Sequence, residues 1–348
     1  MKTRSLDRTT FCVGVLLVAS VMSHVLTAPF PPDAFAFFQP SVTITTNDRN
    51  RLDQGEPVAH VIPAADLQMA VWAAVPVKID ADRLIAWMRR IEELKKSPYV
   101  VAIGRFSDPP RLDDLAGLSL DNQDVSDIMA CRPGRCALKL SSEEMVALRD
   151  AAGHGDAALQ QRFRQMVLDR VDAYLSGGKI GPYTDTTTGV FPGQAFDALL
   201  DHSPFLTEHA PHFAESLRGA PAAAPNGVES FLYWSKESLG GKPSVNVTDV
   251  HILRGQGPGT PDVVVAGKQI FATHYVNASL GVTALVHGEP GRNNYLVYVN
   301  RSEVDMLHGT FAGIIRWFLQ RRLGTEAGNV LQGLRRRLES GEPPHPGA

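Results

Sequence analysis

The fold is decided by residues 263–300, which read VVVAGKQIFATHYVNASLGVTALVHGEPGRNNYLVYVN. Apolar and polar side chains alternate along much of this stretch, as they do in β-strands whose two faces meet different surroundings. The segment 288–294 is rich in Gly, Pro and Asn, which predicts a turn. We therefore expect strands over 263–276, 282–286 and 295–300.

The preceding segments extend this pattern toward the N-terminus. Residues 229–234 and 244–253 are strand-like in the same way, and 71–79 and 99–106 are two earlier strand candidates. Asp80 follows the first of these and fits a helix N-cap, because apolar residues recur after it at helical spacing. The expected order at this end of the chain is strand, helix, strand.

The middle and the end of the chain are predicted to be helical. Ser141 and Glu144 match a capping box, in which each side chain accepts a hydrogen bond from the other residue's backbone. Apolar residues at helical spacing then run from Leu159 to Tyr174, and two glycines end this helix. A last helix is expected from Phe311 to Glu339.

Runs of strands and runs of helices, rather than alternating single elements, predict an α+β fold with an antiparallel sheet. The element order from Val71 to Glu339 resembles the helix-grip fold of START-like (SRPBCC) proteins. This resemblance implies a curved antiparallel sheet that packs on a long C-terminal helix and encloses an apolar cavity, here with a helical insertion in mid-chain. Four stretches are also similar to segments of uncharacterised exported bacterial proteins: CRPGRCALKL at 131–140, YWSKE at 233–237, KQIFATHY at 268–275 and YVNRSEVD at 298–305.

The first 36 residues predict a Sec signal peptide. Basic residues precede an apolar run over 11–26, and residues 34–36 read A-x-A. Cleavage near Ala36 would release the mature chain into the periplasm or the medium. A cut after Ala28 and a retained membrane anchor are the alternatives.

These features divide the chain into parts with distinct expected roles. We expect the signal peptide over 1–36, an irregular N-terminal segment over 37–65, a START-like domain over 66–340 with the helical insertion 141–217, and a disordered tail over 341–348.

Composition excludes one class of partner. The 348 residues carry 34 basic and 37 acidic side chains, a formal net charge of -3. Nucleic-acid-binding proteins usually carry a strong basic excess, so nucleic acid is not an expected partner. Hydrophobic residues make up 44% of the chain, which is enough for a packed core.

Cys131 and Cys136 enclose Arg-Pro-Gly-Arg, whose turn lets the two Cα atoms approach within the ~4.4–6.8 Å that a disulfide requires. Export would place both residues in an oxidising compartment, which favours a disulfide. Two structural thiols, or a redox or metal-binding pair, are the alternatives. The C-x-x-C-H haem signature is absent from the sequence.

The START-like resemblance implies binding or carriage of an apolar small molecule or lipid in a cavity between sheet and helix. His274 lies in an alternating run and is either a buried core residue or a polar group inside that cavity. Tyr298 and Asn300 lie on a neighbouring strand and would orient the ligand; Tyr275 and Arg301 complete the predicted ligand-binding set. Three small side chains are expected to leave room for the ligand: Ala272, Ala278 and Ala284.

Two other function classes stay open. An interaction or structural module of the cell envelope would need no cavity. A hydrolase-type enzyme would use His274 or the His/acid cluster 201–212, in which His209 and His212 are spaced H-x-x-H; a solvated loop interrupted by prolines is the competing interpretation. The G-x-S-x-G, H-E-x-x-H and P-loop signatures are absent from the sequence, so we assign no enzyme activity, metal or cofactor.

The last helix combines arginines with large apolar residues. Core packing against the sheet explains this pattern, and a peripheral membrane contact through the helix is the alternative. Arg301 and Asp305 stand just before this helix and favour a structural ion pair over catalytic groups.

Overall fold

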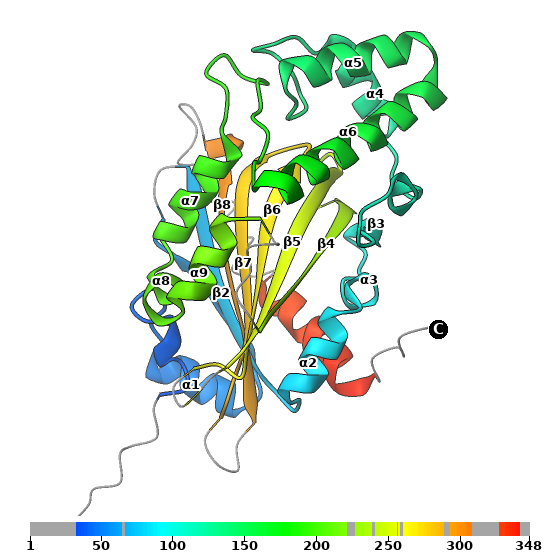
Figure 1. Ribbon diagram of the computed structural model, residues 1–348. Helices are drawn as coiled ribbons and strands as arrows, with labels where there is room; N and C mark the ends of the chain where they lie inside the picture. The colour runs from blue at the N-terminus through cyan, green and yellow to red at the C-terminus, as the bar shows by residue number, and fades with distance from the viewer. Residues whose placement is uncertain are drawn as a thin grey trace, which may run out of the picture. The chain divides into compact units, whose positions relative to one another are not determined.

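The computed structural model describes residues 33–64, 67–220, 227–238, 241–255, 257, 260–288, 293–307 and 327–341 (Figure 1). Contacts divide the chain into units 1–32 and 33–348, and the described residues all belong to the second unit. Most of the predicted signal peptide, the first part of the expected last helix and most of the expected tail therefore lie outside the described residues.

Eight strands form one antiparallel sheet in the order β1-β2-β8-β7-β6-β5-β4-β3. The strands are β1 (Val58–Ile62), β2 (Gln68–Val77), β3 (Val100–Arg105), β4 (Val228–Glu237), β5 (Ser244–Arg254), β6 (Val263–Ala272), β7 (Val276–Val286) and β8 (Asn294–Val304). Every neighbouring pair is antiparallel, so the predicted α+β class with an antiparallel sheet is confirmed.

Helices connect these strands and cover the sheet. They are η1 (Ala36–Phe38), α1 (Thr46–Asp53), α2 (Ala81–Met88), α3 (Ile91–Leu94), η2 (Leu112–Leu115), α4 (Asn122–Ala130), α5 (Ser142–Gly153), α6 (Asp156–Gly177), α7 (Pro192–Asp201), α8 (Pro204–His209), α9 (Pro211–Arg218), η4 (Asp305–Leu307) and a C-terminal helix over 327–340. The expected helical insertion corresponds to α5–α9, with α4 as an addition before it.

The two faces of the sheet belong to different apolar clusters. Along β2, Ala73 and Val75 pack with α2, α3 and the helix over 327–340, whereas Trp72 and Ala74 pack with the N-terminal segment and α7–α9. This alternation follows from the two-residue repeat of a strand. We call the two sides the α2 face and the α7 face.

A third apolar cluster joins α4–α6 to the sheet. Phe163 and Tyr174 of α6 pack with Trp234 of β4 and Phe271 of β6. Figure 1 shows α4, α5 and α6 together at the end of the sheet that lies away from α1 and α2. The helical insertion therefore extends the α7 face over β4–β6.

The segment 37–65 was expected to be irregular, but it contains most of η1 and all of α1 and β1. Thr45 and Asp48 form a capping box that satisfies the backbone at the start of α1, and β1 pairs with β2. The residues just before it are also packed, since Phe35 is 3% exposed and its ring lies 5.1 Å from that of Tyr295. A cut after Ala36 would remove Phe35 from this core.

The predicted loop over 201–212 is also corrected. Pro204 and Pro211 do not interrupt a helix there; they occupy the first positions of α8 and α9. Proline is well suited to that position because its missing N–H would have no partner inside the helix. Phe205 and Leu206 of α8 are buried, so the segment is helical and packed on one side. Its polar residues are nevertheless exposed, as expected: Asp201, His202, Glu208, His209 and His212.

The expected strand over 263–276 is split by a turn. β6 ends at Ala272 and β7 begins at Val276, and Tyr275 between them has a φ of 63°. A non-glycine residue rarely adopts such a φ, so the alternating pattern gives no warning of it. His274 consequently lies in a turn rather than in the middle of a strand.

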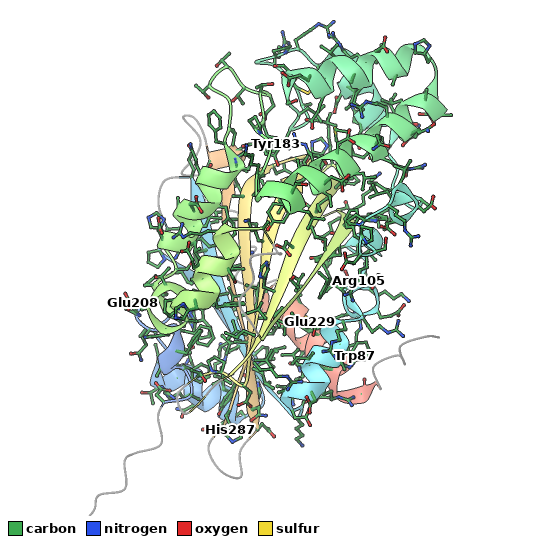
Figure 2. All side chains as sticks on the ribbon, viewed as in Figure 1. Trp87, Arg105, Tyr183, Glu208, Glu229 and His287 are labelled. Carbon is green, nitrogen blue, oxygen red and sulfur yellow. A yellow bond between two sulfur atoms is a disulfide. The ribbon has the colours of Figure 1, made fainter. Side chains whose placement is uncertain are left out.

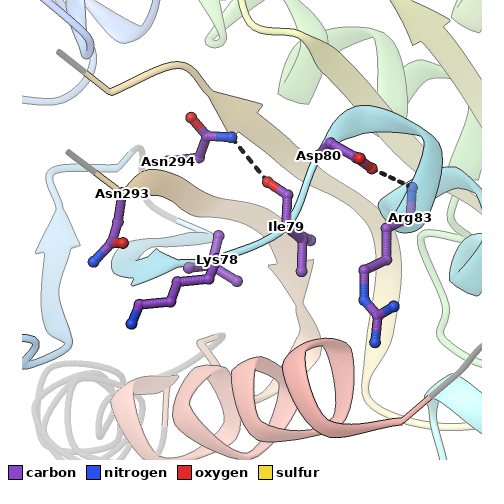
Figure 3. A pocket seen from close by; sticks show the side chains of 7 residues that line it. Lys78, Ile79, Asp80, Arg83, Asn293 and Asn294 are labelled. Atoms are coloured by element: carbon purple, nitrogen blue, oxygen red, sulfur yellow. Dashed lines mark hydrogen bonds between the residues drawn. The ribbon is translucent and has the colours of Figure 1, made fainter. Parts of the chain in front are cut away.

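The end of the C-terminal helix is fixed to α2. Arg83 of α2 donates through Nε to the carbonyl of Leu338 at 2.5 Å and also bonds the carbonyl of Gly341, which satisfies acceptors at the helix end. A hollow of about 310 Å³ lies beside this contact, and Figure 3 shows Arg83 and Asp80 at its edge. Within the described residues, none of the helices has the length and apolar character needed to span a membrane.

Candidate functional site

The five predicted ligand-binding residues do not form one site. Tyr298 packs with the α2-face cluster, and Asn300, two residues later on β8, shares its side of the strand. Arg301 points to the opposite, α7 face, while His274 and Tyr275 lie in the turn between β6 and β7. Strand alternation and the unexpected turn separate residues that are close in sequence.

His274 is a buried, fully bonded residue of this turn. Its Nε2 lies 3.0 Å from Asp124 Oδ1 and its Nδ1 lies 3.0 Å from the carbonyl of Ala137. The neighbouring Tyr275 accepts a hydrogen bond at its hydroxyl from the backbone N–H of Lys242, at 2.7 Å. These bonds tie the turn to α4, to the loop after α4 and to the residues just before β5, which is a structural role.

Arg301 and Asp305 do not form the expected ion pair. Asp305 instead accepts from Lys139 at 2.5 Å. Arg301 is 6% exposed on the α7 face, and burial lowers its pKa from its usual value. The reason for the separation is again alternation, since Arg301 ends up among residues that face α7–α9 rather than beside η4.

The His/acid cluster over 201–212 is dispersed. His202 Nδ1 bonds Gln68 Oε1 at 3.0 Å, His209 Nδ1 bonds the carbonyl of Phe37 at 2.6 Å, and Asp201 accepts from Arg218 at 2.5 Å. Across the described ranges of the chain, three or more His, Cys, Asp and Glu side chains are nowhere arranged to hold a metal ion. The H-x-x-H pair is therefore divided between α8 and α9, and both histidines are exposed.

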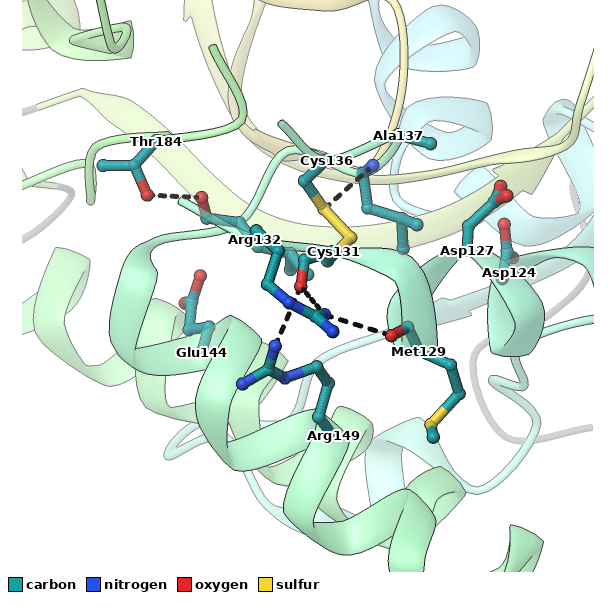
Figure 4. Close-up of a disulfide and its surroundings, with 12 residues drawn as sticks. Asp124, Asp127, Met129, Cys131, Arg132, Cys136, Ala137, Glu144, Arg149 and Thr184 are labelled. Carbon is teal, nitrogen blue, oxygen red and sulfur yellow. Dashed lines mark hydrogen bonds between the residues drawn. A yellow bond between two sulfur atoms is a disulfide. The ribbon is translucent and has the colours of Figure 1, made fainter. Parts of the chain in front are cut away.

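Cys131 and Cys136 form the expected disulfide (Figure 4). The loop that it closes is held by backbone bonds from Gly134 N to Thr184 O, at 2.7 Å, and from Cys136 N to Asp185 O, at 3.0 Å. The disulfide thus fixes the connection between α4 and α5 against the segment that follows α6.

Two glycines shape the centre of the α2 face. Gly267 of β6 and Gly281 of β7 are directly opposite each other, and Asn300 of β8 is next in the same row. Tyr298 Oη and Asn300 Nδ2 lie 3.6 and 3.7 Å from the position that a Cβ of Gly281 would occupy. These polar side chains can therefore lean across β7 because the glycine leaves space there.

A buried amide lies beside this row. Gln269 is 9% exposed and shares the α2 face with Gly267, two residues before it. Its Nε2 has no hydrogen-bond partner within the described part of the chain. Tyr298 nearby is also shielded from water, and burial raises its pKa above its usual value. The centre of the α2 face thus combines donors with little competing solvent.

An ion pair borders this centre on the side of β4. Lys95, the C-cap residue of α3, donates to Glu237 Oε1 at 2.6 Å and to Tyr233 Oη at 3.0 Å. Burial opposes ionisation of Glu237, but Lys95 outweighs burial and lowers the pKa of that carboxyl. Figure 2 shows Trp87, Glu229 and Arg105 on the same side of the sheet, close to α2. Glu229 is paired with Arg89, and Arg105 lies over the ring of Phe231.

A second polar centre lies closed beneath the helices of the α7 face. Asp249 of β5 accepts from Tyr174 Oη at 2.6 Å and bonds His251 Nε2 at 2.8 Å. Lys268 of β6 is the cross-strand partner of Asp249, and its Nζ lies 5.0 Å from the ring centre of Phe196 in α7. All of these polar side chains are at most 2% exposed. We call this group the closed centre.

Sequence reasoning missed the closed centre. The only local signal is the i,i+2 spacing of Asp249 and His251, which places both on one face of a strand. Lys268 and Tyr174 come from distant parts of the chain, and their approach depends on α6 crossing β5 and β6. Burial lowers the pKa of Lys268 to about 8, with Asp249 opposing the shift.

Comparisons with known proteins give distant likenesses. No protein-family model and no curated protein matches the chain. Matching solved structures include a protein from Thermus thermophilus, at 13% identity and a TM-score of 0.24, over 42% of this chain and 88% of that one.

Two di-domain ARO/CYC proteins also match. BexL from the BE-7585A biosynthetic pathway has 11% identity and a TM-score of 0.23, over 84% of this chain and 91% of its own. StfQ from the steffimycin biosynthetic pathway has 12% identity and a TM-score of 0.23, over 83% and 90%. Likenesses this weak carry no argument, so the geometry of this chain must carry the proposals.

Proposed function

We propose that the protein binds a small, largely apolar molecule with one hydrogen-bond acceptor at the centre of the α2 face. The observation that carries this proposal is the buried Nε2 of Gln269, which has no partner within the described residues. A buried donor left without a partner costs about 1–3 kcal/mol. An acceptor atom of a ligand at this point would recover that free energy.

The surroundings of Gln269 suit such a ligand. Gly267 and Gly281 place no side chains over the middle of the sheet. Tyr298 and Asn300 add two further polar groups beside them. Apolar residues of the α2-face cluster lie along the neighbouring strands. A site with mostly apolar walls and a few placed polar groups is typical of small-molecule binding.

The order of the elements supports the finer, START-like interpretation of the fold. β2 is followed by α2, α3 and β3, and β4–β8 form a meander that the helix over 327–340 follows. α2, α3 and that helix all pack on the α2 face. The helix-grip arrangement places its ligand between sheet and helix, which is the side where we locate the site.

The proposed ligand surface differs from the expected one in its small residues. Ala272 pairs with Asn246 and is fully buried, whereas Ala278 and Ala284 pack in the core of the α7 face. Ala278 and Ala284 therefore cannot line a cavity on the α2 face. Gly267 and Gly281 take over the role that the sequence assigned to alanines.

Binding of cis-parinaric acid, a fluorescent fatty acid with a carboxylate acceptor, tests the proposal. We expect saturable binding to the purified full chain, and Gln269→Leu should weaken it about tenfold because one buried hydrogen bond is lost. Gln161→Leu on the exposed side of α6 is the matched control and should bind as the wild type does. Equal binding by Gln269→Leu and the wild type would remove the site, and absence of any apolar ligand by native mass spectrometry would remove the function.

Export to the periplasm or medium is part of the proposal. Since Phe35 is buried against Tyr295, we propose that the leader is cut after Ala28 rather than after Ala36. N-terminal sequencing of the exported protein should find a start before Asp33. A start at Phe37 would contradict this assignment.

The enzyme alternative has less support from the geometry. Both ring nitrogens of His274 are occupied by Asp124 and Ala137, and the residues of 201–212 bond to separate partners. A general base needs a ring nitrogen that can reach a substrate proton. The binding function therefore explains more of the described polar groups than hydrolysis does.

A further inference from the structure

An open hollow of about 530 Å³ lies beside the disulfide, at the end of the sheet where β6 turns into β7. α4, the loop that carries Cys136 and the segment after α6 form its walls. Figure 4 shows the disulfide with Asp124 and Asp127 on one side and Thr184 on the other. The lining residues are Asp127, Ala130, Gly134, Arg135, Cys136, Ala137, Asp185, Thr186 and Thr187. We call this site the disulfide-side hollow.

Asp185 gives this hollow a buried acceptor. The residue lines the hollow but is only 8% exposed, and its Oδ1 has no hydrogen-bond partner in the part of the chain that the structure describes. Burial raises the pKa of Asp185; Lys139 opposes this shift without cancelling it, and Asp305 adds to it.

Negative charges outnumber positive charges around Asp185. One ammonium group, that of Lys139, is shared between Asp305 at 2.5 Å and Asp185 at 3.6 Å, and it also bonds Asn277 Oδ1 at 2.6 Å. The amide of Asn277 in turn donates to Glu303 Oε1 at 3.0 Å. Two carboxylates thus share one ammonium group, and a third, that of Glu303, is reached only through the Asn277 amide, so a further cation would be stabilised here.

The rim of the hollow does not remove this excess. Asp127 is paired with Lys242 across the rim. Arg135 lines the hollow as well, but its side chain is exposed and is screened by water. His274 lies behind Ala137 and is bonded to Asp124, so it is already committed.

We propose that the disulfide-side hollow binds the primary ammonium group of a small organic molecule, with Asp185 Oδ1 as its buried acceptor. An ammonium group brings three N–H donors and a positive charge, which are the two properties that this carboxylate lacks in its surroundings. Among the described residues, no cluster of three or more metal-ligating side chains exists to hold a bare metal ion instead. The hollow, of about 530 Å³, has room for the carbon skeleton of a small organic amine beside Asp185.

Three four-carbon probes of different charge test this proposal: n-butylamine, 1-butanol and butyrate. In two-dimensional ¹H–¹⁵N NMR titrations of the full chain at neutral pH, n-butylamine should shift the backbone amides of Gly134, Cys136 and Thr186 in a saturable way. The alcohol and the acid should leave them unchanged. Saturable shifts of equal size with 1-butanol would show an apolar hollow without a cation site and would overturn the proposal.

Two variants locate the bound ammonium group. Asp185→Asn keeps the shape of the side chain and removes its charge, so it should weaken n-butylamine binding about tenfold or more. Thr187→Trp fills the hollow from an exposed position and should abolish the shifts without touching the buried charges. Asp113→Asn changes an exposed carboxylate elsewhere and is the matched control. Unchanged affinity in both hollow variants would place the amine outside this site.

This inference is independent of the proposed function. Asp185 belongs to the segment after α6, whereas Gln269 lies on the α2 face of β6. Asp185→Asn should therefore bind cis-parinaric acid as the wild type does, and Gln269→Leu should bind n-butylamine normally. Failure of one binding reaction leaves the other measurable.

Discussion

Asp249 and Asp185 each bury one carboxylate oxygen that has no hydrogen-bond partner within the described residues, but their surroundings differ. Asp249 is fully buried beneath the helices of the α7 face, where its other oxygen serves Tyr174 and His251. Asp185 lines an open hollow and faces an excess of carboxylates around one lysine. Similar chemistry therefore has a structural role where helices close it off and can meet a ligand where the surface is open.

The largest expected effect on stability comes from removing the carboxylate of Asp249, and the same change at Asp185 is the comparison. Asp249→Ala leaves Lys268 buried beside no counter-charge and deprives Tyr174 and His251 of their acceptor, so it should lower the free energy of unfolding by about 3–5 kcal/mol. Asp185→Ala relieves an excess of negative charge and should change it by no more than about 1 kcal/mol. Urea unfolding measures both, and equal losses would show that the two centres do not differ in kind.

The pH dependence of stability tests whether the ammonium group of Lys268 is buried in the closed centre. Burial lowers the pKa of Lys268 to about 8, from an ordinary value of 10.5. Between these pH values the unfolded chain binds more protons at this residue than the folded chain, so the free energy of unfolding should rise with pH, by at most about 3 kcal/mol. Lys268→Met should lose this rise, whereas Lys179→Met, at an exposed position, should keep it. An identical slope in both variants would contradict the low pKa.

Removing the disulfide should affect both stability and ligand binding in the disulfide-side hollow. Cys131→Ser combined with Cys136→Ser removes a cross-link of sequence separation 5, which should lower stability by about 2 kcal/mol. The change should also reduce n-butylamine binding, because Cys136 fixes a wall of the hollow. Thermal unfolding and the same NMR titration measure both effects. Chemical reduction of the wild type is the control and should reproduce the variant.

A smaller loss than that of the disulfide is expected at His274. His274→Phe removes the bonds to Asp124 and Ala137 and should lower stability by about 1–2 kcal/mol, because two buried acceptors lose a donor. Binding of cis-parinaric acid should be unchanged, since the residue lies in the β6–β7 turn. A loss of fatty-acid binding in a folded His274→Phe variant would return this histidine to the ligand site.

Local patterns in the sequence were sufficient for most elements of the fold. The capping box of Ser141 and Glu144 opens α5, Asp80 caps α2, and the alternating segments 244–253 and 295–300 are strands. The disulfide was predictable as well, because a short spacer with a Pro-Gly turn brings two cysteines together without help from the rest of the chain.

The sequence by itself thus determined what depends on near neighbours: the strand and helix periods, the caps, the disulfide and the antiparallel α+β class. Tertiary structure decided the sites. Strand alternation already puts Tyr298 and Arg301 on opposite faces, but which helices cover each face depends on non-local packing, and the φ of Tyr275 has no sequence signal. The closed centre exists because α6 brings Tyr174 to a carboxylate 75 residues away, and the hollow exists because the segment after α6 returns to the disulfide loop. Such contacts are fixed by the packing of distant elements, which a single sequence does not specify locally.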